Sequence, residues 1–166
     1  MEIEIRKADI FDIEAEAMVY PGTTDGELND KTGKRLKKLV GKHLAHEIGE
    51  IVPIAVGAAT VLDVTGLHVE HLIYSPLVAE IVEKIIVENV RRCTRAALVA
   101  TCVREFESIA LPVIRPNSED MSITETTRAM IDELRAFRAD HEFTVRLVDP
   151  REYVVDILRR SLEVVR

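Results

Sequence analysis

The chain has 166 residues and a mass of 18.7 kDa, which suits a single domain over residues 1–166 and leaves too little chain for two. Apolar residues make up 47% and charged residues 31%, so the composition excludes a disordered or collagen-like chain. The formal net charge of −7 makes nucleic acid an unfavourable partner, and no apolar stretch is long enough to span a membrane.

The chain start and the cysteines point to the cytoplasm. The segment Met1–Ile5 lacks the cationic flank and apolar run of a signal peptide. Cys93 and Cys102 lie nine residues apart in one predicted helix, on opposite faces, so we expect two reduced thiols, no disulfide and no shared metal. No cofactor and no metal site are expected. The absence of Gln and Trp, with only three Asn, resembles the composition of thermophile proteins.

The first half of the chain predicts strands, a helix and further strands. Glu2–Ile5 alternates as a half-buried strand, and Ala17–Tyr20 is a short apolar run that Pro21 and Gly22 stop. One helix is predicted between Gly33 and Gly49, and two or three strands between Ile51 and Pro76. That helix carries apolar residues at helical spacing: Leu36, Leu39, Val40, Leu44 and Ile48.

The second half alternates helices with strands. The longest helix is predicted from about Ala79 to Phe106, followed by a strand over Ile109–Ile114. Within that strand, Pro112 must occupy a position that needs no backbone donor. Ser122 and Glu125 have the spacing of a capping box, which begins a helix that continues to Phe137.

The last strand and helix are the most clearly marked. Phe143–Val148 alternates as a strand. Asp149 is predicted to cap the next helix, with Pro150 at its first position and apolar residues through Leu162. The whole pattern predicts an α/β protein: a three-layer α/β/α sandwich around a mixed, mostly parallel sheet of about six strands. Ligands bind such sheets at the carboxyl ends of the strands.

Four stretches, in order, resemble the macro domain family. Lys7–Asp12 is similar to the family's Gly-Asp-Ile-Thr segment, and Glu16–Thr23 to its Asp-Ala-Ile-Val-Asn-Ala-Ala-Asn segment. Val69–Tyr74 is similar to the Tyr-Val-Ile-His strand, and Ser108–Pro112 to Ser-Ile-Ala-Phe-Pro. The resemblance covers nearly the whole chain and implies a domain of the ADP-ribose-binding, Appr-1-p processing type.

The resemblance also implies where a ligand would bind. Asp9 and Ile10 match the residues that meet the adenine, and Thr23 stands where the family has the Asn that contacts the distal ribose and places the attacking water. Thr23 is therefore the one weak candidate for catalysis. The further ligand-binding candidates lie within these motifs or follow them in the chain: Tyr20, Lys31, Arg115, Asn117 and Ser118.

The phosphate-binding loops depart from the family pattern. The first glycine-rich loop is replaced by Leu28–Lys31, and the second by Arg115–Asp120, which contains no glycine. Glycines let a backbone approach phosphate closely, whereas Pro116 removes one amide donor. Glu119 and Asp120 would repel a diphosphate unless they turn outward. Binding through the side chains of Lys31 or Arg115 is the remaining route.

Three functions stay open. The first is a binder of a nucleotide or an ADP-ribose-type ligand, with weakened or lost ADP-ribose hydrolase activity. The second is a non-catalytic module for protein interaction or self-assembly as a homo-oligomer. The third is a hydrolase of ADP-ribosyl esters or phosphoesters, served by Thr23 or by a divalent ion on acidic loops, although exposed acidic loops without metal are the preferred interpretation. Those loops carry Asp25, Glu27, Asp30, Glu119 and Asp120.

Overall fold

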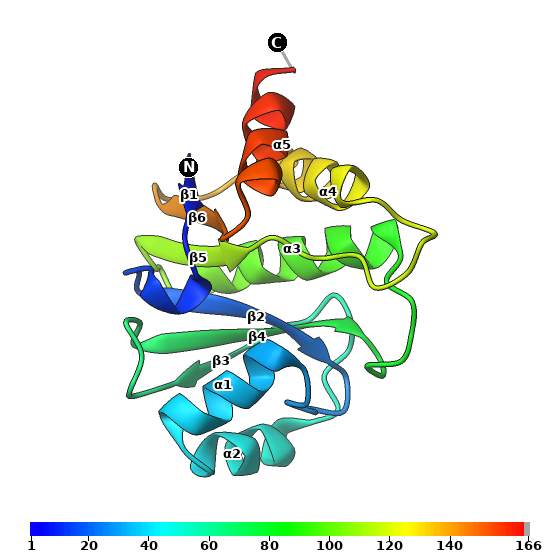
Figure 1. Ribbon diagram of the computed structural model, residues 1–166. Coiled ribbons are helices and arrows are strands. Elements are labelled where there is room, and N and C mark those ends of the chain that lie inside the picture. The colour runs from blue at the N-terminus through cyan, green and yellow to red at the C-terminus, as the bar shows by residue number, and fades with distance from the viewer. Residues whose placement is uncertain (165–166) are drawn as a thin grey trace.

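The computed structural model describes residues 1–164 and contains a six-stranded sheet with helices on both faces (Figure 1). The strands are β1 (Glu2–Lys7), β2 (Ala17–Thr23), β3 (Thr60–Asp63), β4 (His71–Val78), β5 (Ser108–Pro112) and β6 (Thr144–Asp149). Their order is β1-β6-β5-β2-β4-β3, with β3 antiparallel to β4 and every other neighbouring pair parallel. The expected α/β/α sandwich is confirmed.

Alternation along the strands divides the core between the two faces. Met18 and Tyr20 of β2 pack with α1 (Lys31–Val40) and α2 (His43–Ile51). Ala17 and Val19 pack on the opposite face, which is covered by the other three helices. These helices are α3 (Val87–Val103), α4 (Ile123–Ala136) and α5 (Glu152–Glu163). A short 3₁₀ helix, η1 (Ile10–Asp12), follows β1.

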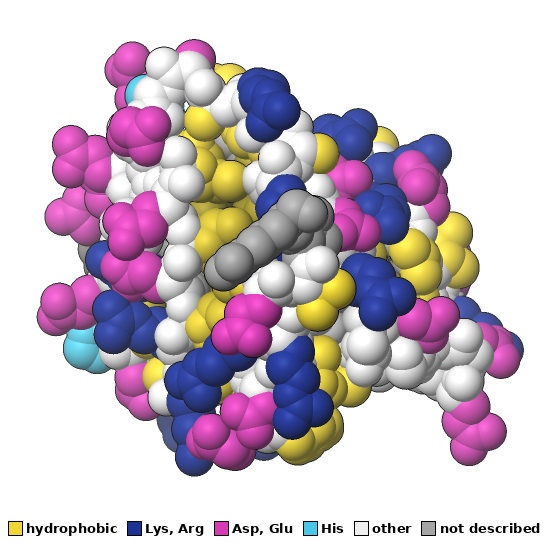
Figure 2. All heavy atoms as spheres, turned by 90° about the horizontal axis from the view of Figure 1, so that it is seen from above, with side chains coloured by type: hydrophobic (Ala, Val, Ile, Leu, Met, Phe, Trp, Pro, Cys, Tyr) yellow, Lys and Arg dark blue, Asp and Glu magenta, His cyan; other side chains and the backbone are white. Residues whose placement is uncertain are grey.

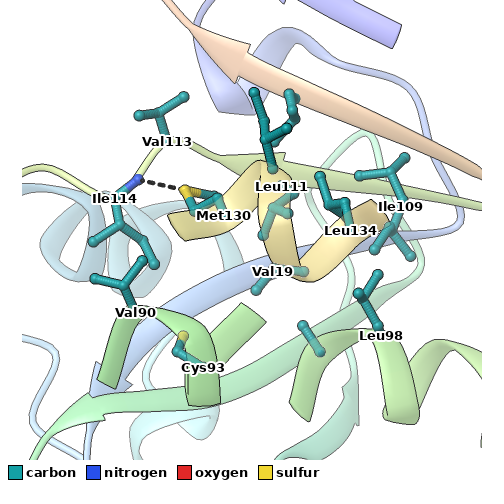
Figure 3. Packing of buried hydrophobic residues seen from close by; sticks show 14 of the residues in the cluster. Val19, Val90, Cys93, Leu98, Ile109, Leu111, Val113, Ile114, Met130 and Leu134 are labelled. Carbon is teal, nitrogen blue, oxygen red and sulfur yellow. Dashed lines mark hydrogen bonds between the residues drawn. The ribbon is translucent and has the colours of Figure 1, made fainter. Parts of the chain in front are cut away.

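The larger core holds the carboxyl end of β5 in place (Figure 3). Leu111 of β5 and Leu134 of α4 are fully buried on this face. The amide of Ile114, just after β5, donates to Met130 Sδ at 3.4 Å. Side chains from the sheet and from two helices therefore support the loop that leaves β5. The labelled members of this core are Val19, Val90, Cys93, Leu98, Ile109, Leu111, Val113, Ile114, Met130 and Leu134.

The helix predicted between Gly33 and Gly49 is two helices. The chain breaks at Gly41, which ends α1 with a φ of 112°, and α2 starts at His43. A positive φ is accessible to glycine at little cost, so Gly41 ends the first helix although the apolar spacing continues beyond it.

The longest helix is shorter than predicted. It begins at Val87, and the preceding segment 79–86 forms turns that the loop after β5 holds. Asn117 accepts from the Ile85 amide at 2.8 Å and donates to the Glu83 carbonyl at 2.6 Å. These contacts from a distant loop compete with the backbone hydrogen bonds of a helix, which explains why the apolar pattern overestimated the length of the helix.

The start of the last helix also differs from the prediction. Asp149 ends β6, and Arg151 is the residue that caps α5. The Asp149 carboxylate still organises the turn, because Oδ1 accepts from the Arg151 amide at 2.9 Å. Strand boundaries fall within a few residues of the predicted ones, and the capping box of Ser122 and Glu125 is confirmed.

The outer surface mixes acidic and basic side chains. Both signs are interspersed over the face seen in Figure 2, with apolar side chains showing between them. Within residues 1–164, none of the helices has the length and apolar content needed to cross a membrane.

Candidate functional site

The sheet opens between β2 and β5. The two strands pair only at their starts, where Ala17 faces Ile109 and Met18 faces Ala110. Beyond that point the chain after β2 leads to α1 on one face, and the chain after β5 leads to α4 on the other. Such a switch point, where neighbouring strands send their connections to opposite faces, is where α/β sheets bind ligands.

Two prolines fit this opening because it needs no backbone donors. Pro21 lies in β2 past the last pair with β5, and so does Pro112 in β5. The Val113 amide donates to Val148 of β6 at 3.1 Å, and donors alternate along a strand, so the missing donor of Pro112 faces the opening. This is the position that the sequence required of Pro112. Because the opening needs no backbone donors, β2 can continue through Pro21 to Thr23, although the sequence predicted that the strand ends before Pro21.

A cavity of about 410 Å³ occupies this opening at the carboxyl edge of the sheet. Its volume falls in the range of small-molecule sites. Its apolar wall includes Ile10, Leu77 and Ile114. The charged and hydroxyl-bearing groups around it are Asp9, Tyr20, Asp30, Lys31, Thr32, Arg35, Arg115 and Asp149.

Asp9 lines the cavity as a fixed carboxylate. It caps η1, and its Oδ1 accepts from the Phe11 amide at 3.0 Å. Its Oδ2 accepts from Arg35 Nη1 at 2.6 Å. Partial burial alone would raise the pKa of Asp9, but these two hydrogen bonds outweigh it and hold the pKa below its ordinary value. The group is ionised at neutral pH and retains lone pairs for a further donor.

Arg35 links α1 to the segment after β1. Its guanidinium lies over the Phe11 ring, 4.3 Å from the centroid, while it pairs with Asp9. Stacking and pairing together fix the orientation of the Asp9 carboxylate. Arg35 was not among the site residues predicted from the sequence. The available signal was its spacing of four residues from Lys31, which places both on one face of α1.

The N-terminus of α1 also faces the cavity, and a carboxylate of the chain itself occupies it. Asp30 Oδ1 accepts from the Gly33 amide at 2.9 Å and from the Tyr20 hydroxyl. Burial, and then the hydrogen bond to Asp30, raise the pKa of Tyr20, so it stays a neutral donor. A Cβ on Gly33 would lie 2.6 Å from Asp30 Oδ1 and 2.7 Å from the Tyr20 hydroxyl. Only glycine allows these groups to approach so closely.

Two further cationic side chains, Lys31 and Arg115, also line the cavity. Lys31 lies in the first turn of α1 and forms no ion pair with another residue of the described range 1–164. Arg115 follows β5, and its Nε is 4.0 Å from Asp149 Oδ2. Asp149 is buried and is already bound by Arg151, through Nε at 2.9 Å and Nη2 at 3.0 Å. Lys31 and Arg115 are thus the side chains best placed to meet an anion.

The remaining predicted site residues lie outside the cavity lining. Thr23 is buried in the turn after β2, where its hydroxyl donates to Asp25 at 2.6 Å and accepts from the Glu27 amide at 3.1 Å. Asn117 holds the 79–86 segment, as described above. The Ser118 hydroxyl is buried and has no hydrogen-bond partner within residues 1–164. The structure therefore brings Asp9, Ile10, Tyr20, Lys31 and Arg115 together at the cavity, and not these three.

The acidic residues of the second loop turn away from the cavity. Asp120 forms an ion pair with Lys84 at 2.6 Å, and both Glu119 and Asp120 are exposed. The repulsion that they would exert on a diphosphate is reduced accordingly. Across the described part of the chain, the five acidic residues of the two loops do not gather into a metal-binding cluster.

The fold and the cavity define an α/β/α protein with a ligand-sized site at the switch point of its sheet. The chain belongs to the Macro domain family, whose profile matches residues 18–130, more than half of its length. The resemblance seen in the sequence motifs is confirmed.

Individual proteins are similar over almost the whole chain. An uncharacterized protein of Aquifex aeolicus (strain VF5) is 28% identical over 162 residues, covering 98% of each chain. A mutant of the Oceanobacillus iheyensis macrodomain superposes with a TM-score of 0.83 at 18% identity, covering 97% of this chain and 90% of the other. The Trypanosoma brucei macrodomain in complex with ADP-ribose gives a TM-score of 0.81 at 15% identity, covering 97% and 69%.

Proposed function

We propose that this chain binds a nucleotide or an ADP-ribose-type ligand in the cavity between β2 and β5, and that it has little or no ADP-ribose hydrolase activity. The observation that carries the proposal is the set of charged groups that line the cavity. Asp9 supplies a fixed carboxylate to the cavity lining, and Lys31 and Arg115 supply two cationic side chains. An adenine amino group needs an acceptor, and a diphosphate needs donors, so this set of groups suits an adenine nucleotide.

Related structures support the ligand class. The Oceanobacillus iheyensis macrodomain has been solved with ADP, and the Trypanosoma brucei macrodomain with ADP and with ADP-ribose. Asp9 follows β1 in the stretch that resembles the family's adenine-contacting segment. We assign the adenine contact to Asp9 and Ile10 by this likeness.

The proposed diphosphate site differs from a glycine-rich loop. Asp30 satisfies the α1 N-terminus that would otherwise attract an anion, and the loop after β5 contains no glycine. The proposal therefore places the phosphates against the side chains of Lys31 and Arg115. Flexible side chains lose entropy when they bind, which makes weak affinity the expected result.

The proposed loss of hydrolysis rests on Thr23. Its hydroxyl is buried and already donates to Asp25 and accepts from the Glu27 amide, so it is not available to orient a water molecule in the cavity.

Calorimetric titration with ADP-ribose, ADP and AMP tests the binding proposal. Replacement of Lys31 or Arg115 by Ala should weaken ADP-ribose and ADP binding by about tenfold, as expected for a lost charge-assisted hydrogen bond. The matched control is Lys38→Ala, on the same helix but outside the cavity lining, which should leave affinity unchanged. Asp9→Asn keeps an acceptor for the Phe11 amide and should weaken all three adenine ligands.

Two results would contradict the proposal. The absence of heat at ligand concentrations on the order of millimolar would remove the binding function and favour the interaction module. Release of ADP-ribose from a mono-ADP-ribosylated protein, if abolished by Thr23→Val, would show that hydrolysis is retained and that Thr23 takes part in it.

A further inference from the structure

A second cluster of chemically reactive side chains lies far from the cavity, near the amino ends of β5 and β6. Cys102 is in the last turn of α3, and Asp140 and His141 lie in the connection between α4 and β6. The Cys102 thiol sulfur, an Asp140 carboxylate oxygen and a His141 ring nitrogen all lie within 4.8 Å of one another. This spacing lets the three groups share one metal ion.

The hydrogen bonds of His141 leave its Nδ1 nitrogen available to bind a metal ion. Its Nε2 lies 2.9 Å from the Phe106 carbonyl, an acceptor that requires a proton on Nε2. In the neutral ring, Nδ1 then carries a lone pair, and this lone pair faces Asp140 Oδ1 at 3.1 Å. Two acceptors at that distance repel each other unless a proton or a metal cation lies between them. Metal-binding histidines commonly donate their other ring nitrogen to a backbone carbonyl, as His141 does.

The end of α3 supplies that carbonyl in a defined position. The Phe106 amide donates to the Thr101 carbonyl at 3.0 Å, and the Glu105 amide to the Cys102 carbonyl at 3.1 Å. These two bonds form a Schellman motif. Phe106 is buried, and the Phe143 ring lies 5.3 Å from the His141 ring. Packing therefore helps to hold both the Phe106 carbonyl and the His141 ring in place.

The charges around the cluster suit a divalent cation. A thiolate, a carboxylate and a neutral imidazole together carry a formal charge of −2. The carbonyl end of α3 adds partial negative charge. Two further carboxylates lie next to the cluster in sequence: Glu105 is unpaired within residues 1–164, and Glu142 pairs with the Met1 amine at 2.8 Å. The neighbouring cation, Arg104, faces Asp63 and the Phe106 ring.

We propose that Cys102, Asp140 and His141 bind a zinc ion, with water as the fourth ligand. The mixture of sulfur, nitrogen and oxygen donors is typical of Zn²⁺ and unlike the oxygen-only sites of Mg²⁺ and Ca²⁺. The ion would join the end of α3 to the α4–β6 connection. It stabilises the fold at the edge of the sheet opposite the ligand cavity and takes no part in nucleotide binding.

The test uses Co²⁺ as a spectroscopic probe of the complete chain, prepared metal-free and reduced. One equivalent of Co²⁺ should produce a thiolate-to-cobalt charge-transfer band in the near ultraviolet, and Zn²⁺ should displace the cobalt and remove the band. Cys102→Ser should abolish the band. The matched control is Cys93→Ser, because Cys93 is buried in the core on the other side of α3 and should leave the band intact.

Thermal unfolding gives an independent readout. Zn²⁺ should raise the melting temperature of the wild-type chain, and a chelator should reverse the rise, because a ligand bound only to the folded state stabilises it. His141→Gln should lose this rise, whereas His43→Gln, on the surface of α2, should keep it.

Several outcomes would overturn the proposal: no charge-transfer band in the wild type, a band that persists in Cys102→Ser, or a zinc-dependent melting shift that survives in His141→Gln. If Cys102→Ser does not fold, the His141→Gln titration decides the question, because its cobalt affinity should fall at least tenfold. ADP-ribose titration of both variants should match the wild type, which separates this site from the cavity.

Discussion

At the scale of single residues, Asp30 places a carboxylate in the cavity wall at the N-terminus of α1. Its carboxylate caps α1 through the Gly33 amide and accepts from Tyr20, so it satisfies the positive end of the helix dipole. In many nucleotide sites a phosphate takes that place. Here the Asp30 carboxylate occupies the position, and under the proposed function a bound diphosphate would lie beside it.

Asp30→Asn should tighten ADP-ribose binding. Asparagine caps a helix about as well as aspartate, so the stability of α1 should be nearly unchanged. Removal of one negative charge near the diphosphate should gain about 1 kcal/mol after screening, or about fivefold in Kd. Calorimetry at two salt concentrations measures this gain, which should shrink at the higher one. Equal or weaker binding in the variant would show that the phosphates lie elsewhere.

At the scale of an element, the end of α3 contains a strained residue. Glu105 has a φ of 53°, in the left-handed region where a side chain is unfavourable, and it occupies the position of the Schellman motif that glycine usually takes. The predicted helix ran on to Phe106, whereas this turn ends it at Val103 and leads the chain into β5.

Glu105→Gly should stabilise the protein by about 0.5–1 kcal/mol, because the relief of left-handed strain exceeds the extra entropy of glycine in the unfolded chain. Glu105→Ala is the matched control. It removes the same charge but keeps a Cβ, so no comparable gain is expected. Urea unfolding of the metal-free proteins measures both. A gain of equal size in the two variants would assign the effect to charge and not to backbone conformation.

At the scale of the whole molecule, carboxylates spread over the surface make the fold sensitive to acid. The pKa of Glu4 is lowered mainly by Arg6, that of Glu125 by the Ser122 amide in the capping box, and that of Glu152 by Lys7. The pKa of Asp9, which lines the cavity, is lowered as well. In each case the folded state favours the ionised form more than the unfolded state does.

Stability should therefore fall as the pH decreases below about 4.5, the ordinary value for Glu. The contribution of a carboxylate with a lowered pKa is fully present above its unfolded value and is lost as the pH falls through its folded value. Urea midpoints measured between pH 7 and pH 3 check this. The capping-box variant Glu125→Gln should show a shallower decline, and an unchanged midpoint down to pH 3 in the wild type would contradict the argument.

The sequence predicted the cavity only in part. Asp9 and Lys31 follow local motifs, a strand end and a helix start, so their position at the carboxyl edge could be inferred from chain order. Asp149 was expected to cap a helix, yet it lines the cavity wall beside Arg115. Thr23, Asn117 and Ser118 are close in sequence to cavity residues but do not line the cavity. Thr23 forms hydrogen bonds within its own turn, and Asn117 is bound to the 79–86 segment.

The order and type of most helices and strands follow from local patterns. Apolar periodicity, the capping box at Ser122 and the β-branched runs act within a few residues, and they specify an α/β sandwich without reference to the rest of the chain. Other features depend on contacts between distant segments. The divergence of β2 from β5, the pairing of Arg35 with Asp9 and the meeting of Cys102 with His141 arise only when the sheet assembles. Local spacing cannot encode them, because the partners are brought together by packing across the fold.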